Sequence, residues 1–354
     1  MINRVRRRLR SSTRLVALYR GVRGGIAGAS PKASPIVAPA ADLGRIKELR
    51  RVGLRRAEDD RPRLNLIIPS VNPTATFGGI RTALDLFAVL GDSSTRKRII
   101  SLAPVDAEAQ AALPDYELSG PAEDQEPGRA LVSLGDPPGG SLAVGAGDRF
   151  VATFWTTAEL ATWIRAWQAD QYPNRSTSMA YLIQDFEPGF YPWSAQSLLA
   201  LETYADQAGT VAIYNTGLLR DYFHASGLGF EREFVFEPRL SPSLRRRLAE
   251  PDPSRSRQIV IYGRPKTARN AFPLLIEGLR AWRLRHPAAG SWSVISVGQP
   301  HADIDLGGGL TVHSRGKLSL DDYATLLRES AIGVSFMVSP HPSYPPLEMA
   351  TLGL

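Results

Sequence analysis

The stretch that decides the fold class is LNLIIPSVNPTATFGGIRTALDLFAVL, residues 64–90. Its first seven residues, Leu64–Ser70, form a short apolar run that is typical of a buried strand. A loop with Gly78 and Gly79 follows, and apolar residues then recur at helical spacing. A strand, a glycine-containing loop and a helix form the first unit of an open α/β sheet, in which ligands bind at the carboxyl ends of the strands.

The same alternation of strand and helix continues along the chain. We expect further strands in RKRIISLAP, RFVATF, MAYLI, GTVAIYN, EREFVFEPRL, QIVIYG, SWSVISVG, LTVHSRG and AIGVSFMVSP. We expect helices in TAELATWIRAW, SAQSLLALETYAD, GLLRDYFHASG, AFPLLIEGLRAWRLRHP and LDDYATLLRES, with Thr156 or Thr157 as the N-cap of the first of these. Strands separated by helices predict an α/β protein with parallel sheets and right-handed crossovers.

A polar, proline-bearing segment at residues 241–257 divides this alternation and is typical of an interdomain linker. We therefore expect a basic tail and linker at 1–60, a Rossmann-like domain at 61–240 and a second Rossmann-like domain at 258–354. Two such domains in tandem would face each other across a cleft at the carboxyl ends of both sheets.

Composition excludes several classes of protein. The chain has 354 residues, of which 43% are hydrophobic and 22% charged, and these are globular values. It has no cysteine, which excludes disulfides, thiolate metal sites and a cysteine nucleophile, and this fits a reducing cytoplasm. No apolar run approaches the roughly 20 residues that a membrane helix needs. We expect a cytoplasmic protein.

The basic charge belongs to the tail. Residues 1–60 hold 15 Lys or Arg and 5 Asp or Glu, whereas the remainder holds 27 and 30, so the body is slightly acidic and no nucleic-acid partner is expected. Residues 1–25 contain eight Arg and no acid. Two interpretations stay open for them: an amphipathic helix on the anionic inner face of a membrane, or a solvated tail.

Two cations, Arg264 and Lys266, follow the first strand expected in the second domain. An Arg fork and a Lys ammonium at a carboxyl edge suit the oxygens of a phosphate. The simpler alternative is a pair of solvated loop cations.

The last residues, SPHPSYPPLEMATLGL at 339–354, predict a helix that begins near Pro346 or Leu347. Backbone N–H groups at such a start bind anions, and Glu348 would lie in the first turn. This Glu either complements the helix dipole or accepts hydrogen bonds from ribose hydroxyls. A nucleoside diphosphate would satisfy the cations, the helix start and the carboxylate together.

These motifs carry a family resemblance. The pattern of GRPK after a strand, then RGKLSLDDY, then SPHPSYPPLEMA resembles the C-terminal half of GT-B retaining glycosyltransferases of the large sugar-nucleotide family 4. Together with LNLIIPSVNPTATFGGI, YLIQDFEPGFYPW and IYNTGLL, it is most similar to rhamnosyltransferases that build bacterial surface polysaccharides. The resemblance extends from about Leu64 to the end.

The resemblance implies a role for several residues. Arg264 and Lys266 match the diphosphate-binding pair, which stabilises the leaving group. Glu348 matches the second glutamate of an E-x7-E motif, a ribose ligand, whereas the first would fall at Pro340 and is absent. The other residues expected around the nucleotide sugar at this end are His341, Ser343 and Tyr344.

Further roles follow from the same resemblance. Gly78 and Gly79 match a loop that approaches the donor phosphates, and Lys317 lies where base and phosphate contacts occur. Asp185 and Glu187 are candidates, on an exposed loop, for holding acceptor hydroxyls or the donor sugar. The alternative for these two acids is a turn with a helix cap.

The chemistry implied is retaining transfer of a hexosyl or deoxyhexosyl unit, in particular L-rhamnose from dTDP-L-rhamnose, to a saccharide or lipid-linked acceptor in surface polysaccharide synthesis. Alternatives are a transferase that uses a UDP- or GDP-hexose, and a non-catalytic relative that binds nucleotide sugars. No metal is expected, because the D-x-D match at Asp303–Asp305 precedes three glycines in an apparent loop.

Relative to the family pattern, the chain stops soon after the last motif. The family pattern predicts further elements that would cover a sheet edge and the last helix, so we expect either a fragment or a truncated relative. We expect this truncated second domain to have reduced stability and impaired activity, which calorimetry against a longer chain would check.

Overall fold

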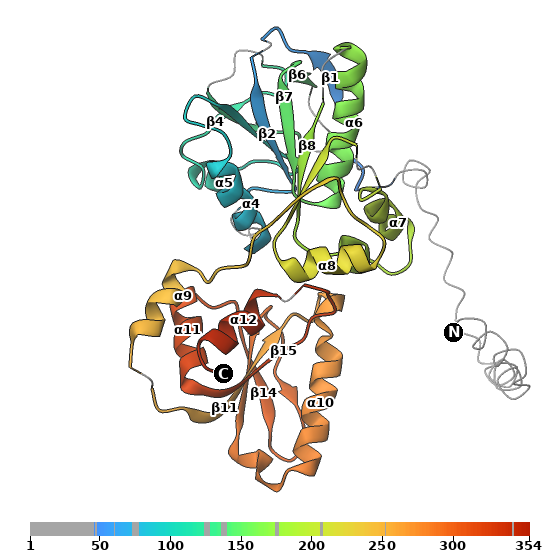
Figure 1. Cartoon of the computed structure of the whole chain (residues 1–354). Coiled ribbons are helices and arrows are strands. Elements are labelled where there is room, and N and C mark those ends of the chain that lie inside the picture. The colour runs from blue at the N-terminus through green and yellow to red at the C-terminus, as the bar shows by residue number, and fades with distance from the viewer. Residues whose placement is uncertain are drawn as a thin grey trace, which may run out of the picture. The chain divides into compact units, whose positions relative to one another are not determined.

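A computed structural model describes the chain from residue 46 to its end, apart from residues 47, 60, 73–77, 124–127, 136–139, 174–176, 206–207, 252 and 342 (Figure 1). Lys47–Leu354 forms one compact unit. Residues 1–25, for which an amphipathic helix and a solvated tail are both open, lie outside the described residues. In the described part of the chain, no helix is both long enough and apolar enough to span a membrane.

Eight strands form the first sheet. They are β2 (Arg63–Ile68), β3 (Arg96–Ser101), β4 (Glu117–Ser119), β5 (Arg129–Ser133), β7 (Asp148–Ala152), β8 (Met179–Ile183), β9 (Thr210–Tyr214) and β10 (Arg232–Val235). Their order is β10-β9-β8-β7-β2-β3-β5-β4, and every pair is parallel, as predicted. Two short strands, β1 (Gly53–Arg56) and β6 (Ser141–Val144), pair separately.

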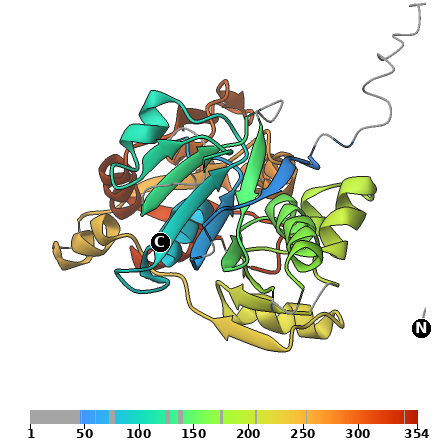
Figure 2. The same cartoon turned by 90° about the horizontal axis from the view of Figure 1, so that it is seen from above.

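Helices cover both faces of this sheet. They are α4 (Gly78–Val89), α5 (Ala107–Ala111), α6 (Trp155–Gln171), the 3-10 turn η2 (Glu187–Phe190), α7 (Ala195–Glu202) and α8 (Gly217–Ala225). Viewed from above, the green and yellow helices α6–α8 lie together on one side of the strands (Figure 2).

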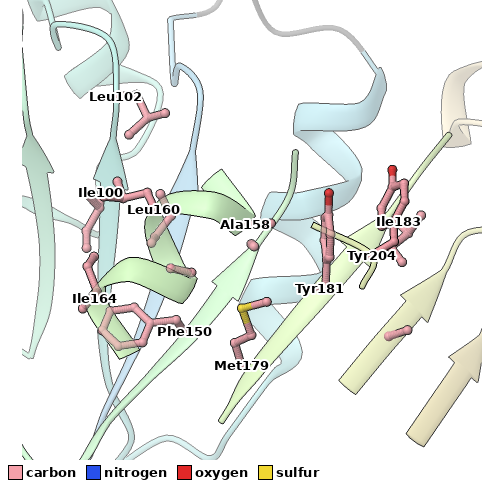
Figure 3. Close-up of a cluster of buried hydrophobic side chains, with 14 of the residues drawn as sticks. Ile100, Leu102, Phe150, Ala158, Leu160, Ile164, Met179, Tyr181, Ile183 and Tyr204 are labelled. Carbon is pink, nitrogen blue, oxygen red and sulfur yellow. The ribbon is translucent and has the colours of Figure 1, made fainter. Parts of the chain in front are cut away.

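The apolar run of β2 follows from this double cover. Leu66 lies in one buried cluster with Phe87 of α4, whereas Ile67 lies in another with Ile164 of α6. The second cluster, which also contains Phe150, is drawn in Figure 3. A strand that is buried on both faces needs apolar side chains at successive positions rather than at alternate ones.

The second sheet has five strands. They are β11 (Ser256–Gly263), β12 (Ser293–Gly298), β13 (Ile304–Asp305), β14 (Thr311–Gly316) and β15 (Ser330–Ser335). Their order is β13-β14-β12-β11-β15, and only β13 is antiparallel to its neighbour. Because the chain enters at β11 and then builds outward on both sides, the switch point lies between β11 and β15, where open α/β sheets bind ligands.

Helices also cover both faces of the second sheet. They are α9 (Pro242–Arg246), η3 (Arg247–Ala249), η4 (Ala268–Asn270), α10 (Phe272–Arg285), η5 (Pro287–Ser291), α11 (Leu320–Glu329) and α12 (Tyr344–Thr351). Leu275 and Leu279 of α10 pack on one face, and Leu327 of α11 and Met349 of α12 pack on the other. The expected domain boundaries stay a prediction.

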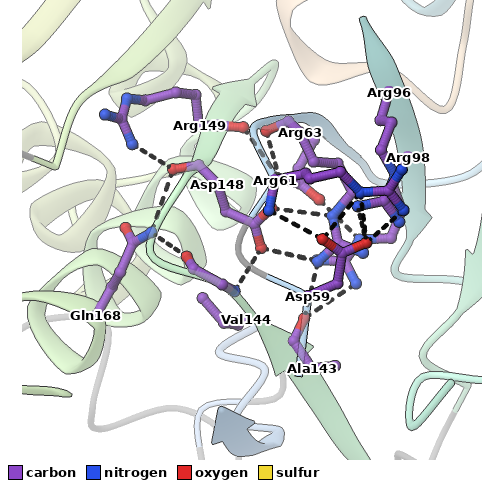
Figure 4. A network of polar contacts seen from close by, with 12 residues as sticks. Asp59, Arg61, Arg63, Arg96, Arg98, Ala143, Val144, Asp148, Arg149 and Gln168 are labelled. Atoms are coloured by element: carbon purple, nitrogen blue, oxygen red, sulfur yellow. Dashed lines mark hydrogen bonds and ion pairs between the residues drawn. The ribbon is translucent and has the colours of Figure 1, made fainter. Parts of the chain in front are cut away.

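A buried ionic network joins the amino ends of β2, β3 and β7 (Figure 4). Arg63 donates to Asp148 through Nε at 2.9 Å and Nη2 at 2.8 Å, and Nη2 of Arg98 lies 3.6 Å from the same carboxylate. Burial opposes ionisation of Asp148, but Arg63 and Arg98 outweigh it and lower its pKa. The network therefore fixes the edge of the sheet opposite to its carboxyl ends.

Two local expectations are wrong. The N-cap of α6 is Phe154 instead of Thr156 or Thr157, and the Thr157 hydroxyl accepts from the Phe154 N–H at 2.9 Å. The last helix begins at Tyr344, so Glu348 lies in its second turn. The proline-rich turn is part of the helix itself, because Pro fits the first turn, where its missing N–H costs nothing.

Candidate functional site

The carboxyl edge of the second sheet brings three chain segments side by side. In register, Gly263 of β11 faces Gly298 of β12, and Val297 of β12 faces Gly316 of β14. A Cβ on Gly298 would lie 2.5 Å from the Gly263 carbonyl oxygen, and its φ is +126°. Only glycine permits this close approach, which packs the three loops after the strands tightly together.

Asn270 organises the loop that carries Arg264. Its buried side chain accepts from the Arg264 N–H at 2.7 Å and donates to the carbonyls of Tyr262 at 3.3 Å and Phe336 at 3.0 Å. One amide therefore joins the segment after β11 to the segment after β15. Lys266 is exposed at the end of the same loop, and its N–H donates to the Gln299 side chain at 3.0 Å.

Glu348 is a half-buried acid at this edge. Burial raises its pKa, and the nearby Tyr323 of α11 lowers it only in part. The described residues give it no ion-pair partner. Burial also raises the pKa of the Tyr262 phenol, to which Arg264 and Glu348 both lie close enough to contribute in opposite directions. The structure thus brings Arg264, Tyr262 and Glu348 together at the switch point.

The start of α12 is a weaker anion site than expected. Its N-cap is Ser343, and Pro345 and Pro346 occupy its first turn. Proline has no backbone N–H, so two of the donors that a helix start usually offers are missing. Charge on a bound diphosphate would therefore fall mainly to Arg264 and Lys266.

Asp185 and Glu187 are not exposed, and this expectation is wrong. Glu187 is 2% exposed, and its carboxylate accepts from the Trp155 N–H at 2.5 Å and from the Tyr181 hydroxyl at 3.3 Å. Burial raises the pKa of Glu187. The Glu187 carboxylate therefore accepts a backbone N–H at the N-terminus of α6, a helix that precedes it in sequence. Its side chain is buried in the fold and not exposed on the loop.

Asp185 has partners from the second sheet. Its carboxylate pairs with Arg269 of η4 and accepts from the Ser339 hydroxyl at 2.5 Å. The Arg269 guanidinium also lies 4.0 Å from the centre of the Phe190 ring. Asp185 is therefore engaged in holding the segment between β15 and α12.

That segment, residues 336–343, carries several of the expected residues. His341 is 7% exposed, and its Nε2 lies 3.3 Å from Nδ2 of Asn215. The Tyr344 hydroxyl lies 3.4 Å from the Thr82 hydroxyl of α4, the helix that begins at Gly78.

The structure also places the other two expected elements of the site, Gly79 and Lys317. Gly79 accepts through its carbonyl from Gln184 Nε2 at 3.0 Å, which ties the start of α4 to the segment before Asp185. Lys317 is exposed after β14, separated from β11 by β12.

Several buried polar side-chain atoms in and around residues 336–343 have no hydrogen-bond partner among the residues that the structure describes. Within the described chain, no hydrogen-bond partner is found for the following side-chain atoms of the segment and its surroundings: Asn215 Oδ1, Ser335 Oγ, His341 Nδ1 and Ser343 Oγ. Buried polar groups are rarely left unpaired, so such a concentration indicates a place for a polar ligand or ordered water. No group of three or more His, Asp or Glu side chains in the described residues could hold a metal.

Sequence reasoning missed Asn215, Asn270, Arg269 and Ser339. Asn215 directly follows β9, and a polar residue just after a strand is the signal that could have found it. Arg269 and Ser339 bond to Asp185, which lies 84 and 154 residues away, and no local pattern reveals such partners. Asn270 bonds to Arg264 and Tyr262 nearby, but its link to Phe336 spans 66 residues.

Comparison with known proteins adds a family. Residues 63–217 match the model described as WsaF, N-terminal domain, and residues 257–354 match WsaF, C-terminal domain. The chain carries both WsaF domains. WsaF domains define a glycosyltransferase family. The C-terminal WsaF domain contains the Arg264 loop and α12, and the N-terminal one contains Asp185 and Asn215.

One curated relative is an O-antigen biosynthesis protein, RfbC, from Myxococcus xanthus. It is 33% identical over 198 residues, which are 55% of this chain and 15% of the relative. The chain thus spans about 15% of the length of this relative. The relative's name assigns that protein to O-antigen biosynthesis.

Proposed function

We propose that this protein is a glycosyltransferase of the GT-B type, whose donor binds at the carboxyl edge of the second sheet. The observation that carries the proposal is the half-buried Glu348, a carboxylate without an ion-pair partner among the described residues, placed near Arg264 at the switch point. A carboxylate in this position accepts hydrogen bonds from the two hydroxyls of a ribose. The WsaF family and the relative's role in O-antigen synthesis support a saccharide product.

The reaction proposed is a front-face transfer with retention. The bond between the anomeric carbon and the diphosphate oxygen breaks, and the acceptor oxygen bonds to the same face of that carbon. The leaving diphosphate oxygen takes the acceptor proton, so no enzymic nucleophile is needed. Arg264 and Lys266 stabilise the negative charge that develops on the leaving group, which is the largest electrostatic demand of the step.

The donor proposed is dTDP-L-rhamnose, and the acceptor is a saccharide or a lipid-linked saccharide. This finer assignment rests on the resemblance of SPHPSYPPLEMA and QDFEPGFYP to rhamnosyltransferase motifs. A UDP- or GDP-hexose donor is the alternative. A non-catalytic relative is favoured by one observation, namely that Pro340 occupies the place of the first glutamate of the E-x7-E motif.

Donor turnover tests the proposal. The 354-residue chain is incubated with dTDP-L-rhamnose, UDP-glucose or GDP-mannose and a saccharide acceptor, and nucleotide release and product anomer are followed by NMR. The proposal expects release of one nucleotide with retention, and loss of release in Arg264→Ala. Tight nucleotide binding without any turnover would favour the non-catalytic alternative.

The basic tail gives the proposal a second part, attachment to an anionic membrane surface. Vesicles that contain phosphatidylserine should bind the full chain, and 0.5 M salt should weaken this binding because exposed charges are screened. A chain that lacks residues 1–25 should bind markedly less. Equal binding by both chains would contradict a membrane role for the tail.

A further inference from the structure

Asn215 and His341 form a buried polar pair that the proposed reaction has not used. Asn215 directly follows β9 and is 1% exposed, and His341 lies on the segment before α12 and is 7% exposed. Nδ2 of Asn215 lies 3.3 Å from Nε2 of His341 and 3.3 Å from the Gln184 carbonyl oxygen.

These contacts fix the direction of each hydrogen bond. The backbone carbonyl of Gln184 can only accept a hydrogen bond. The amide nitrogen of Asn215, and not its oxygen, therefore faces both this carbonyl and His341. Nε2 of His341 is therefore the acceptor. Burial lowers the pKa of His341, which keeps the ring neutral. The ring proton is consequently on Nδ1.

One donor and one acceptor are left over. Nδ1–H of His341 and Oδ1 of Asn215 are buried, and neither has a partner in the part of the chain that the structure describes. The nearby carboxylate of Asp185 is already engaged by Arg269 and Ser339. An unmade hydrogen bond of a buried group costs free energy, so this pair is complementary to a group that both accepts and donates. A hydroxyl has this property, whereas a phosphate only accepts.

We infer that Asn215 and His341 recognise a hydroxyl of the donor sugar and thereby determine which sugar the site accepts. This inference rests on the proposed function. His341 lies on the segment that leads into α12, and Glu348 lies on that helix, so the pair and the proposed ribose ligand belong to one continuous stretch of chain. That placement favours the donor sugar over the acceptor as the source of the hydroxyl.

Isothermal titration separates the sugar from the nucleotide. For the full chain, the affinity for dTDP is compared with that for dTDP-L-rhamnose, and likewise UDP with UDP-glucose and GDP with GDP-mannose. In Asn215→Ala and His341→Ala, the affinity for the nucleoside diphosphate should change less than about 2-fold. The additional affinity that the sugar provides should fall about 10-fold, as expected for lost hydrogen bonds to a neutral hydroxyl.

Controls keep the test decisive. His313→Ala removes an exposed histidine that pairs with Asp303, and it should change neither affinity. Asn215→Asp and His341→Gln keep a polar side chain of similar size, and they replace the Ala variants if those fail to fold. The 15N shifts of His341 should report the Nδ1–H form in the free protein.

Each other outcome overturns the inference in a different way. Nucleotide binding by the wild type with an unchanged contribution of the sugar in the variants would contradict the role of the pair alone. Equal loss of both affinities would show a purely structural role. A raised KM for the acceptor with unchanged donor affinity would assign the hydroxyl to the acceptor. No nucleotide binding by the wild type would overturn the proposed function together with the inference.

Discussion

Glu348 and Glu187 show how one residue type takes two roles in this chain. Glu187 is buried and Glu348 is half-buried, and burial raises the pKa of each. Glu187 accepts from the Trp155 N–H and the Tyr181 hydroxyl, so its acceptor capacity is used inside the fold. Glu348 has a hydrogen bond from the Tyr323 hydroxyl but no comparable backbone donor, so part of its acceptor capacity is not used inside the fold. The partner atoms, and not the loop in which an acid stands, decide between structure and binding.

Replacing Glu348 by Gln should stabilise the protein while weakening nucleotide binding. A raised carboxyl pKa in the folded state means that the folded protein holds its proton more tightly, so stability falls as pH rises through the raised pKa. Glu348→Gln removes this loss and should raise the free energy of unfolding at pH 7. The gain should vanish at pH 4, which calorimetry at both pH values measures. A destabilised variant at pH 7 would contradict a raised pKa of Glu348 in the folded protein.

At the scale of elements, loops after the strands are held by side chains from other elements. Asn270 joins the loop after β11 to the segment after β15, and Asp185 joins that segment to the loop after β8. A site built in this way is predictable from sequence only in part. The apolar run of β2 and the strand–loop–helix pattern around Arg264 follow from local periodicity. The burial of Asp185 does not, because its partner Ser339 is 154 residues away.

Short edge elements were also beyond prediction. β1, β4 and β6 have three or four residues each, and β4 exposes two of its three side chains. A strand that is so short and partly exposed has no apolar periodicity by which it could be identified in the sequence. Arg264 was predictable because it directly follows the long strand β11, and Glu348 was predictable because prolines mark the start of the helix that carries it.

Asn270→Ala should destabilise the protein and loosen the Arg264 loop. The substitution removes three hydrogen bonds of a fully buried amide and leaves their partners unpaired, which costs about 2–4 kcal/mol. Nucleotide affinity should fall as well, since Arg264 loses its fixed position. Gln299→Ala is the matched control because it removes one bond to the Lys266 N–H, and it should cost less than about 1 kcal/mol. Equal effects of the two variants in denaturant titrations would contradict the role of Asn270.

Across the whole molecule, one buried charge network lies at a different sheet edge from the binding groups, whereas the Asp185–Arg269 pair lies at the candidate site. The network of Arg63, Arg98 and Asp148 fixes the amino ends of the first sheet, whereas the candidate site occupies carboxyl ends. Variants of the network should therefore change stability without changing the affinity of the site. This separation makes the proposed function testable, because variants of the network should affect folding stability and variants of the site should affect nucleotide binding.

Asp148→Asn should cost about 3–5 kcal/mol of stability, because it leaves two buried guanidinium groups without their carboxylate. The lowered pKa of Asp148 means that its contribution is present above the ordinary carboxyl pKa and is lost as pH falls through the folded-state value. Acid titrations of melting temperature should therefore show a smaller decline for the variant. Asp303→Asn changes an exposed acid with a lowered pKa, and it should leave the melting temperature nearly unchanged.

The most direct measurement is isothermal titration of dTDP, UDP and GDP into the full chain and three variants. The account predicts that one nucleotide binds the wild type and that Arg264→Ala and Glu348→Gln each weaken it at least about 10-fold. Arg257→Ala is the control, since Arg257 is an exposed arginine near the opposite end of β11, and it should bind like the wild type. Binding that survives in both site variants, or is lost equally in the control, would contradict a nucleotide site at this edge.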